Sequence, residues 1–138
     1  TGATVGLISH VSMNASGTVA FVANLPVPVP IAYYSQAGTG PLVPLLVDGG
    51  PSTVPGGGAA GLPRSVLGPI FDDGRALIHL SVLGGTTDYA YLLRSSAGVT
   101  SMILTTSDDL PAGGRTVFTQ RGSGVHAISR SGLALGST

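Results

Sequence analysis

The sequence predicts an all-β fold built from short antiparallel strands, and three observations support that prediction. Gly occurs 22 times and Pro 10 times in 138 residues, so no window of about a dozen residues is both free of helix breakers and apolar at helical spacing. The chain has no Lys and no Glu, two residue types that favour the surfaces of helices. Several segments instead alternate with period two, which is the periodicity of a strand.

An internal repeat organises the chain. Gly17, Gly74 and Gly132 follow similar segments and are spaced by 57 and then 58 residues. The pair Ala-Tyr at residues 32–33 returns 58 positions later at residues 90–91. Self-similarity at a fixed period of this length is typical of repeat architectures. The predicted domain, residues 1–138, divides into unit one at about 3–61, unit two at about 62–121 and a partial third unit at about 122–138.

Each complete unit contains four strand candidates, which we expect to pair as a four-stranded antiparallel sheet. Within residues 18–25, Val19, Phe21 and Ala23 would occupy one face of such a strand. Units of this kind fit a β-propeller-like or a β-sandwich-like array. The candidates are residues 5–13, 18–25, 31–35 and 42–47 in unit one, 65–71, 75–82, 89–94 and 101–106 in unit two, and 125–129 and 133 onward in unit three.

Turn-forming residues separate the first and second strand of each unit. They are Asn14 and Gly17 in unit one, Asp72 and Gly74 in unit two, and Gly132 in unit three. Asn and Asp hydrogen-bond to nearby backbone and Gly accepts a positive φ, so all three residue types favour tight turns. Residues 49–61, by contrast, are rich in Gly, Pro and Ala, and we expect them to form an exposed, mobile loop.

Residues 14–21, with the sequence NASGTVAF, resemble the NxxGxxAF-type tandem repeat of secreted bacterial surface proteins. The Pro-Gly-Gly signal at residues 55–57 is similar to the end of that family's repeat unit. The resemblance covers about residues 5–118 and the opening of the third unit, although Leu77 and Ile78 replace the Ala and Phe in unit two. It implies a β-propeller-type array that is exported and often anchored at the cell surface, and it implies no catalytic residues.

The charge pattern argues against two classes of partner. Six Arg and six Asp residues give a formal net charge of zero, and charged residues make up only 9% of the chain. Because no basic cluster is present, we expect neither nucleic-acid binding nor attraction to an anionic membrane surface. No apolar run reaches the ~20 residues that span a bilayer. A surface with so little charge also opposes self-association only weakly.

Residues that could catalyse a reaction or bind a metal are scattered along the chain. His10, His79 and His126 lack metal-ligand spacing, and we interpret them as histidines on strand surfaces. The acidic pairs lie beside turn residues and are interpreted as turn formers, with a calcium site at Asp108 and Asp109 as the weaker alternative. The chain has no Cys and no Gly-x-Ser-x-Gly motif. We therefore predict no enzymatic activity and no cofactor.

The predicted function is structural: an extracellular or cell-surface repeat module that self-associates. Apolar, uncharged terminal strands would pair with another chain by strand addition and build a surface assembly or filament. The alternative is a carbohydrate- or ligand-binding β-propeller fragment, because tyrosines can stack on sugar rings, although tyrosines in strands more often pack on neighbouring strands. The candidate contact residues for that alternative are Tyr33, Tyr34, Tyr89 and Tyr91.

Overall fold

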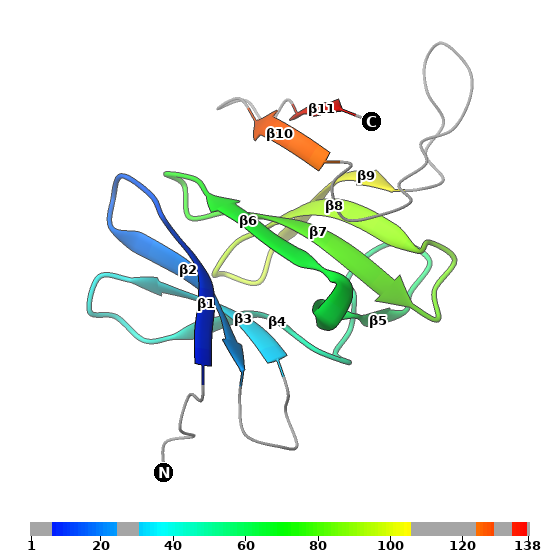
Figure 1. The fold of residues 1–138 in the computed structure, drawn as a ribbon, viewed down its shortest axis with the longest axis horizontal. Helices are drawn as coiled ribbons and strands as arrows, with labels where there is room; N and C mark the ends of the chain where they lie inside the picture. Colours follow the sequence, from blue (N-terminus) through cyan, green and yellow to red (C-terminus); the bar gives the residue numbers. More distant parts are fainter. Residues whose placement is uncertain (1–6, 25–30, 106–123, 129–133, 138) are drawn as a thin grey trace.

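The computed structural model describes residues 7–24, 31–105, 124–128 and 134–137, and these residues form an all-β fold (Figure 1). Helical structure among them is limited to one 3₁₀ turn, η1 (Leu62–Arg64). None of the described residues belongs to a helix long and apolar enough to cross a membrane. The strands are β1 (Leu7–Met13), β2 (Thr18–Asn24), β3 (Ile31–Ala37), β4 (Val43–Val47), β5 (Ala59–Ala60), β6 (Val66–Ile70), β7 (Ala76–Leu83), β8 (Tyr89–Arg94), β9 (Thr100–Thr105), β10 (Gly124–Ile128) and β11 (Ala134–Ser137).

Two antiparallel sheets make up most of the described fold. The first sheet contains β1, β2, β3 and β4, each paired with the next strand along the chain. The second sheet contains β6, β7, β8 and β9 in the same arrangement, and the short β5 pairs with the end of β7. Strands β10 and β11 form a separate two-stranded sheet. Apart from β5, which the alternating pattern did not predict, the strand bounds lie within two residues of those expected.

The first hairpins of the two sheets share one register. Two of the described pairs of β1 with β2 return 57 positions later in β6 and β7, and all three described pairs of β6 with β7 return 58 positions later in β10 and β11. A β-bulge interrupts each of these three hairpins in the same region. The equivalent pairs are Ser9 with Val22, Val66 with His79, and Gly124 with Ser137.

The second hairpins also coincide, with an offset of 58 positions. The register of β3 with β4 shifts between Tyr33 and Tyr34, and the register of β8 with β9 shifts between Tyr91 and Leu92. An extra residue at a bulge bends the strand and increases its twist, so the two sheets are deformed at matching places. One inserted residue between the first and second hairpins accounts for the change of offset from 57 to 58.

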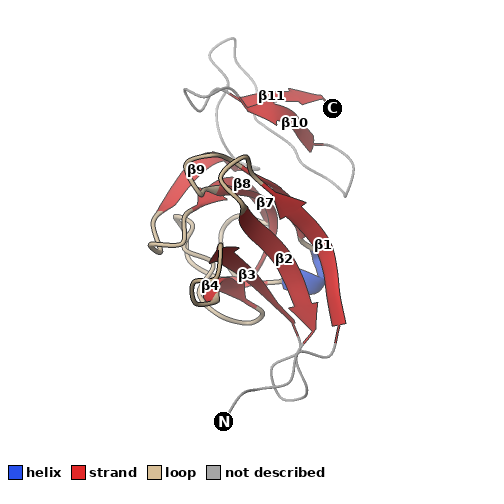
Figure 2. Cartoon of the chain, turned by 90° about the vertical axis from the view of Figure 1, so that its left-hand side faces the viewer, coloured by secondary structure: helices blue, strands red, loops and turns tan. Residues whose placement is uncertain are grey.

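The interior lies between the two sheets, which face each other at an angle in Figure 2. The first strands of the sheets, β1 and β6, lie next to each other. Apolar residues of both sheets form one buried cluster, in which Tyr33 of β3 is the largest fully buried side chain. Its members from the second sheet include Ala76, Ile78 and Leu80 of β7 and Ala90 and Leu92 of β8.

Residues 49–61 are largely exposed, as the composition predicts, but a few buried residues and backbone hydrogen bonds fix the segment against the rest of the fold. The backbones of Gly50 and Ala60 are hydrogen-bonded (Ala60 N to Gly50 O, 2.8 Å), and Ser52, Val54 and Ala60 are buried. A side chain on Gly58 would come within 2.6 Å of the side chain of Val82. The glycine is therefore needed for close approach of this segment to β7, a role that composition alone does not distinguish from flexibility.

Candidate functional site

Asn14 joins the first turn to the second sheet. Its Oδ1 accepts hydrogen bonds from the backbone N–H groups of Ser16 (3.1 Å) and Thr18 (2.8 Å), which fixes the turn between β1 and β2. Its Nδ2 donates to the carbonyl oxygen of Phe71 (2.7 Å), at the start of the next turn. The backbone N–H of Ala15 also donates to the carboxylate of Asp72 (3.1 Å). These bonds form a polar seam between the two sheets.

The turn between β6 and β7 has the same backbone path with different side chains. Gly17 and Gly74 have φ angles of +81° and +82°, the left-handed conformation that favours glycine. Phe71 lies at the position equivalent to Asn14, and its backbone N–H donates to Arg75 O as Asn14 N donates to Thr18 O. Gly132, expected to fill the corresponding place in unit three, lies outside the described residues.

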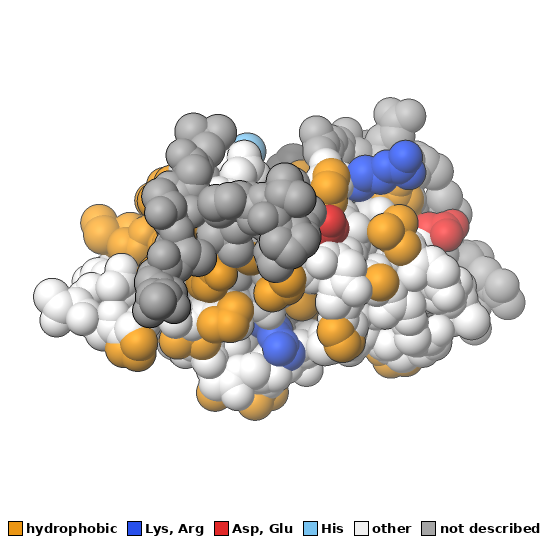
Figure 3. All heavy atoms as spheres, turned by 90° about the horizontal axis from the view of Figure 1, so that it is seen from below, with side chains coloured by type: hydrophobic (Ala, Val, Ile, Leu, Met, Phe, Trp, Pro, Cys, Tyr) orange, Lys and Arg blue, Asp and Glu red, His pale blue; other side chains and the backbone are white. Residues whose placement is uncertain are grey.

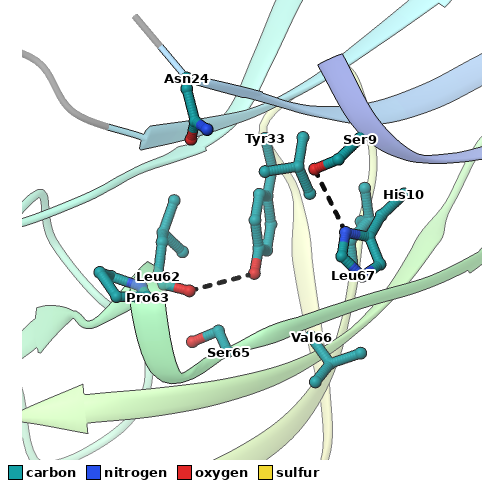
Figure 4. A pocket seen from close by; sticks show the side chains of 10 residues that line it. Ser9, His10, Asn24, Tyr33, Leu62, Pro63, Ser65, Val66 and Leu67 are labelled. Carbon is teal, nitrogen blue, oxygen red and sulfur yellow. Dashed lines mark hydrogen bonds between the residues drawn. The ribbon is translucent and has the colours of Figure 1, made fainter. Parts of the chain in front are cut away.

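A hollow of about 370 Å³ opens between the first sheet and the beginning of unit two (Figure 4). It lies where β1 and β2 face η1 and the first residues of β6. The described residues that line it are Ser9, His10, Val22, Asn24, Tyr33, Leu62, Pro63, Ser65, Val66 and Leu67. None of these is Asp or Arg, so apart from the imidazole of His10 the lining described by the structure is uncharged.

Some polar groups of the hollow are already used by the fold. The hydroxyl of Tyr33 donates to the carbonyl oxygen of Leu62 at 3.5 Å. The hydroxyl of Ser65 donates to Gly61 O (2.8 Å) and accepts from the backbone N–H of Ser81 (2.9 Å). These bonds hold η1 and β6 against the two sheets, so they shape the wall of the hollow.

Other polar groups of the hollow are available to a ligand. The half-buried amide of Asn24 makes no side-chain hydrogen bond to the described residues, and Figure 4 places it on the side opposite Ser9 and His10. The Nδ1 atom of His10 lies 3.3 Å from the hydroxyl of Ser9. A serine beside a histidine has the composition of a nucleophile–base pair, but no described carboxylate bonds to His10 to orient its ring. The arrangement therefore offers hydrogen bonds without an assembled catalytic group.

The outward face of β1 is apolar. Ile8, Val11 and Met13 are exposed to 52%, 62% and 69% of their surfaces. The intervening residues Ser9 and Ser12 face the second sheet, since Ser9 lines the hollow and Ser12 accepts a hydrogen bond from the backbone N–H of Ile70. We call Ile8, Val11 and Met13 the β1 stripe. Figure 3 shows one face of the molecule, on which apolar side chains are scattered among few charged ones.

The four tyrosines that the sequence suggested as ligand contacts lie in three separate places. Tyr33 lines the hollow, but its side chain is almost fully buried. Tyr34 stacks on Phe21 with ring centroids 5.9 Å apart. Tyr89 and Tyr91 both contact His79, with ring centroids 5.6 Å and 4.5 Å away. Only Tyr33 adjoins the hollow, and it contributes a wall and not an open stacking platform.

His79 is buried, so its prediction as a surface histidine was wrong. Only 7% of its surface is exposed, and its ring stacks on Tyr91 at an interplanar angle of 9°. Within the part of the chain that the structure describes, its Nε2 atom has no hydrogen-bond partner. Burial lowers the pKa of His79, because the charged imidazolium loses its hydration. Strand β7 is covered on both faces for most of its length, which an alternating sequence pattern does not predict.

The acidic residues in the described part of the chain serve the turns. The Asp73 carboxylate forms an ion pair with Arg75 (Oδ2 to Nε, 2.6 Å). Burial acts to raise the pKa of Asp73, but hydrogen bonds from the Arg75 backbone and side chain, together with its charge, lower that pKa overall. The described residues contain no group of three or more side chains suited to hold a metal ion. Asp108 and Asp109, the candidate calcium residues, lie outside them.

Comparisons of the chain with protein-family models, with curated proteins and with solved structures find no match. The function must therefore be inferred from the fold and from the surfaces described above. Sequence reasoning singled out His10 and Tyr33 but missed the other residues of the hollow, of which Asn24 carries the clearest signal. It is the polar residue that ends an apolar alternating segment, and the repeat aligns it with Ser81 at an offset of 57.

Proposed function

We propose that this protein is a non-catalytic β-repeat module of the cell surface or extracellular space that associates with copies of itself through its terminal strands. The observation that supports this most directly is the β1 stripe. Three large apolar side chains point outward from one strand, and no Asp or Arg occurs in β1 to oppose contact with a neighbour. Exposed apolar surface of this kind is typical of interaction sites.

Unit two covers parts of both edges of the first sheet, which favours association through the β1 stripe over pairing at those edges. The edge of β1 is engaged near Ser12, whose hydroxyl accepts from Ile70 N at 3.2 Å. The edge of β4 is engaged at Leu45, whose carbonyl oxygen accepts from the guanidinium of Arg94 at 3.1 Å. Because unit two occupies parts of both edges, the outward side chains of β1 are the freer surface. Association through them buries apolar area that is otherwise exposed to water.

Light scattering over a concentration series tests the proposal. We expect the intact protein to show a mass that rises above the 13.6 kDa of one chain as concentration increases. Replacing Ile8, Val11 and Met13 together by Thr keeps strand propensity but removes apolar area, so this variant should remain at the mass of one chain. Val99→Thr is the matched control, since Val99 is 62% exposed at the distant turn between β8 and β9.

Two outcomes would refute the proposal. One is a wild-type mass that stays at 13.6 kDa throughout the series. The other is association of the triple variant with the same concentration dependence as the wild type. Circular dichroism of both proteins shows that a change in mass does not arise from unfolding.

A further inference from the structure

The hollow between the two sheets has the size and chemistry of a small-molecule site. Its volume of about 370 Å³ falls at the lower end of the range of roughly 300–1,000 Å³ found for ligand pockets. Apolar side chains form much of its wall, among them Val22, Leu62 and Val66. A few polar groups converge on it from opposite sides, and this combination fixes the orientation of a bound ring.

We propose that this hollow binds an uncharged, hydroxylated ring of monosaccharide size. Asn24 supplies both donors and an acceptor through its amide, and Ser9 supplies a hydroxyl. These groups suit ligand hydroxyls, which both donate and accept. A phosphate or carboxylate ligand would find no Arg among the described lining residues, and a cationic ligand would find no Asp. The C–H face of a sugar ring would contact Val22 and Val66.

The backbone of β1 is shaped to direct His10 at this site. His10 has a φ angle of +50°, which is uncommon for a residue other than glycine. It lies in the bulge between Ser9 and Ser12. Bulges re-aim side chains and occur often beside binding sites, and unfavourable backbone conformations are concentrated at such sites. His10 thereby reaches the rim of the hollow and adds a ring nitrogen to its hydrogen-bonding groups.

The two sheets have the same strand register, but the positions of the second sheet that are equivalent to the hollow are buried. The positions equivalent to Val22, Asn24 and Tyr33 are His79, Ser81 and Tyr91. His79 stacks on Tyr91 at 4.5 Å, and all three of these residues are buried. The same strand register thus accommodates a filled site in unit two and an open one in unit one. Among these positions, Val22 is smaller than His79, so the first sheet lacks the ring that packs on the equivalent tyrosine in unit two.

Nuclear magnetic resonance titrations of the full chain test this proposal. The probes are methyl glucoside, methyl galactoside and N-acetylglucosamine, with glucuronate and glucose 6-phosphate as charged counterparts. We expect at least one neutral probe to bind with a dissociation constant on the order of 1–10 mM, as befits a small ligand held by few bonds. The amide resonances that shift should belong to β1, β2, η1 and β6.

Two variants and one control locate the binding. Val66→Phe narrows the hollow from its rim, and Asn24→Leu removes the amide at similar size; each should weaken binding at least about tenfold, equivalent to 1.4 kcal/mol. Val99→Phe makes the same substitution at an exposed turn and should leave binding unchanged.

The titration of the wild-type protein decides the proposal even if a variant does not fold. Three results overturn it: no neutral probe binds at tens of millimolar, the shifted resonances lie outside the four elements, or the charged probes bind as well as the neutral ones. Binding that survives both folded variants also overturns it. Because these titrations use dilute protein and map one site, they are independent of self-association through the β1 stripe.

Discussion

The first and second sheets share a strand register, but they close their first hairpins with different chemistry. In the first turn, Asn14 Oδ1 receives the backbone N–H of Thr18. In the second turn, the equivalent N–H belongs to Arg75, and it donates to the carboxylate of Asp73 (3.0 Å), two residues further along than the position of Asn14. Each turn satisfies the same backbone donor, but of the two side chains that do so, Asn14 and Asp73, only Asn14 also bonds across to the other sheet; in the second turn Asp72 instead accepts the bond across the seam.

This difference separates what the hairpin requires from what the interface between sheets requires. A glycine at positive φ and the pairing of the flanking strands are common to both turns, so they define the backbone path. Asn14 contributes an additional bond from its Nδ2 to Phe71 O, and it is almost fully buried. A buried polar group that is left unpaired costs free energy. Because Asn14 bonds both within its own turn and across to Phe71, a change at Asn14 should destabilise the turn and the interface between the sheets together.

The largest effect should follow from Asn14→Ala. This change leaves the N–H groups of Ser16 and Thr18 and the carbonyl of Phe71 without their present partner. We expect the free energy of unfolding to fall by about 2–3 kcal/mol, from the cost of unsatisfied buried groups. Urea denaturation measures this loss. The matched control is Asn24→Ala, which removes an amide with no side-chain hydrogen bond to the described residues and should cost less than about 0.5 kcal/mol.

A loss for Asn14→Ala no larger than that for Asn24→Ala would show that the seam adds nothing to stability. The coupling between sheets can be tested separately by combining Asn14→Ala with Asp72→Ala. Both side chains bond across the same seam, so the double variant should lose less stability than the sum of the single variants.

A smaller and more uniform effect should follow from replacing the turn glycines. Gly17→Ala and Gly74→Ala each place a Cβ at a positive φ, and no atom lies within 4 Å of that Cβ in either turn. The cost is therefore conformational, at about 1–2 kcal/mol in each case. Equal losses in thermal or urea denaturation would indicate a common backbone requirement. A large loss at one glycine alone would contradict the equivalence of the two turns.

The contribution of each sheet to the free energy of unfolding should also depend differently on pH, and we expect this effect to be smaller than the loss caused by the glycine substitutions. Burial lowers the pKa of His79 below the ordinary value of 6.5, so the unfolded chain binds more protons than the folded chain at mildly acidic pH. The stability associated with neutral His79 is therefore present above pH 6.5 and is lost as the pH falls below it. The equivalent residue of the first sheet, Val22, does not titrate.

Urea denaturation of wild type and His79→Phe between about pH 5 and 8 isolates this contribution. Phe keeps a ring against Tyr91 but cannot be protonated, so the difference in free energy of unfolding between the two proteins should change across this range in the direction stated. A constant difference would show that His79 has the same pKa in the folded and unfolded states. His10→Phe is the control for an exposed histidine.

The strands were predictable because the chain alternates with period two and is divided by turn residues at regular intervals. Gly17 and Gly74 could be placed in turns because they follow Asn14 and Asp72–Asp73, and both have the positive φ that such turns need. The packing of residues 49–61 was not predictable in the same way. Glycine permits both flexibility and close approach, and only the proximity of Gly58 to Val82 distinguishes them.

The candidate sites were harder to predict, because they depend on which sheet face is covered. An alternating strand such as β7 normally leaves its polar face in water, and His79 was placed there on that basis. Both faces of β7 are in fact covered over most of the strand. The hollow depends on contact between β1–β2 and η1–β6, about 57 residues apart in the chain, and periodicity within one strand contains no information about that contact.

The smallest effect should follow from Asp73→Ala, which sharpens the contrast with Asn14. Asp73 binds the backbone N–H and the guanidinium of Arg75, so on contacts alone it resembles Asn14 as a turn-closing residue. Its side chain is 49% exposed, however, and water can replace both partners. Exposed ion pairs contribute little, and we expect a loss of about 0.5 kcal/mol or less at neutral pH.

Because the folded pKa of Asp73 is lowered from 3.8, the stability that its ionised form adds is present above that value and disappears as the pH falls through the folded pKa. The urea midpoints of wild type and Asp73→Ala should therefore converge in acid, while those of wild type and Asn14→Ala stay apart, since an amide does not titrate. A loss for Asp73→Ala as large as that for Asn14→Ala would mean that closing the turn, and not joining the two sheets, accounts for the importance of both residues.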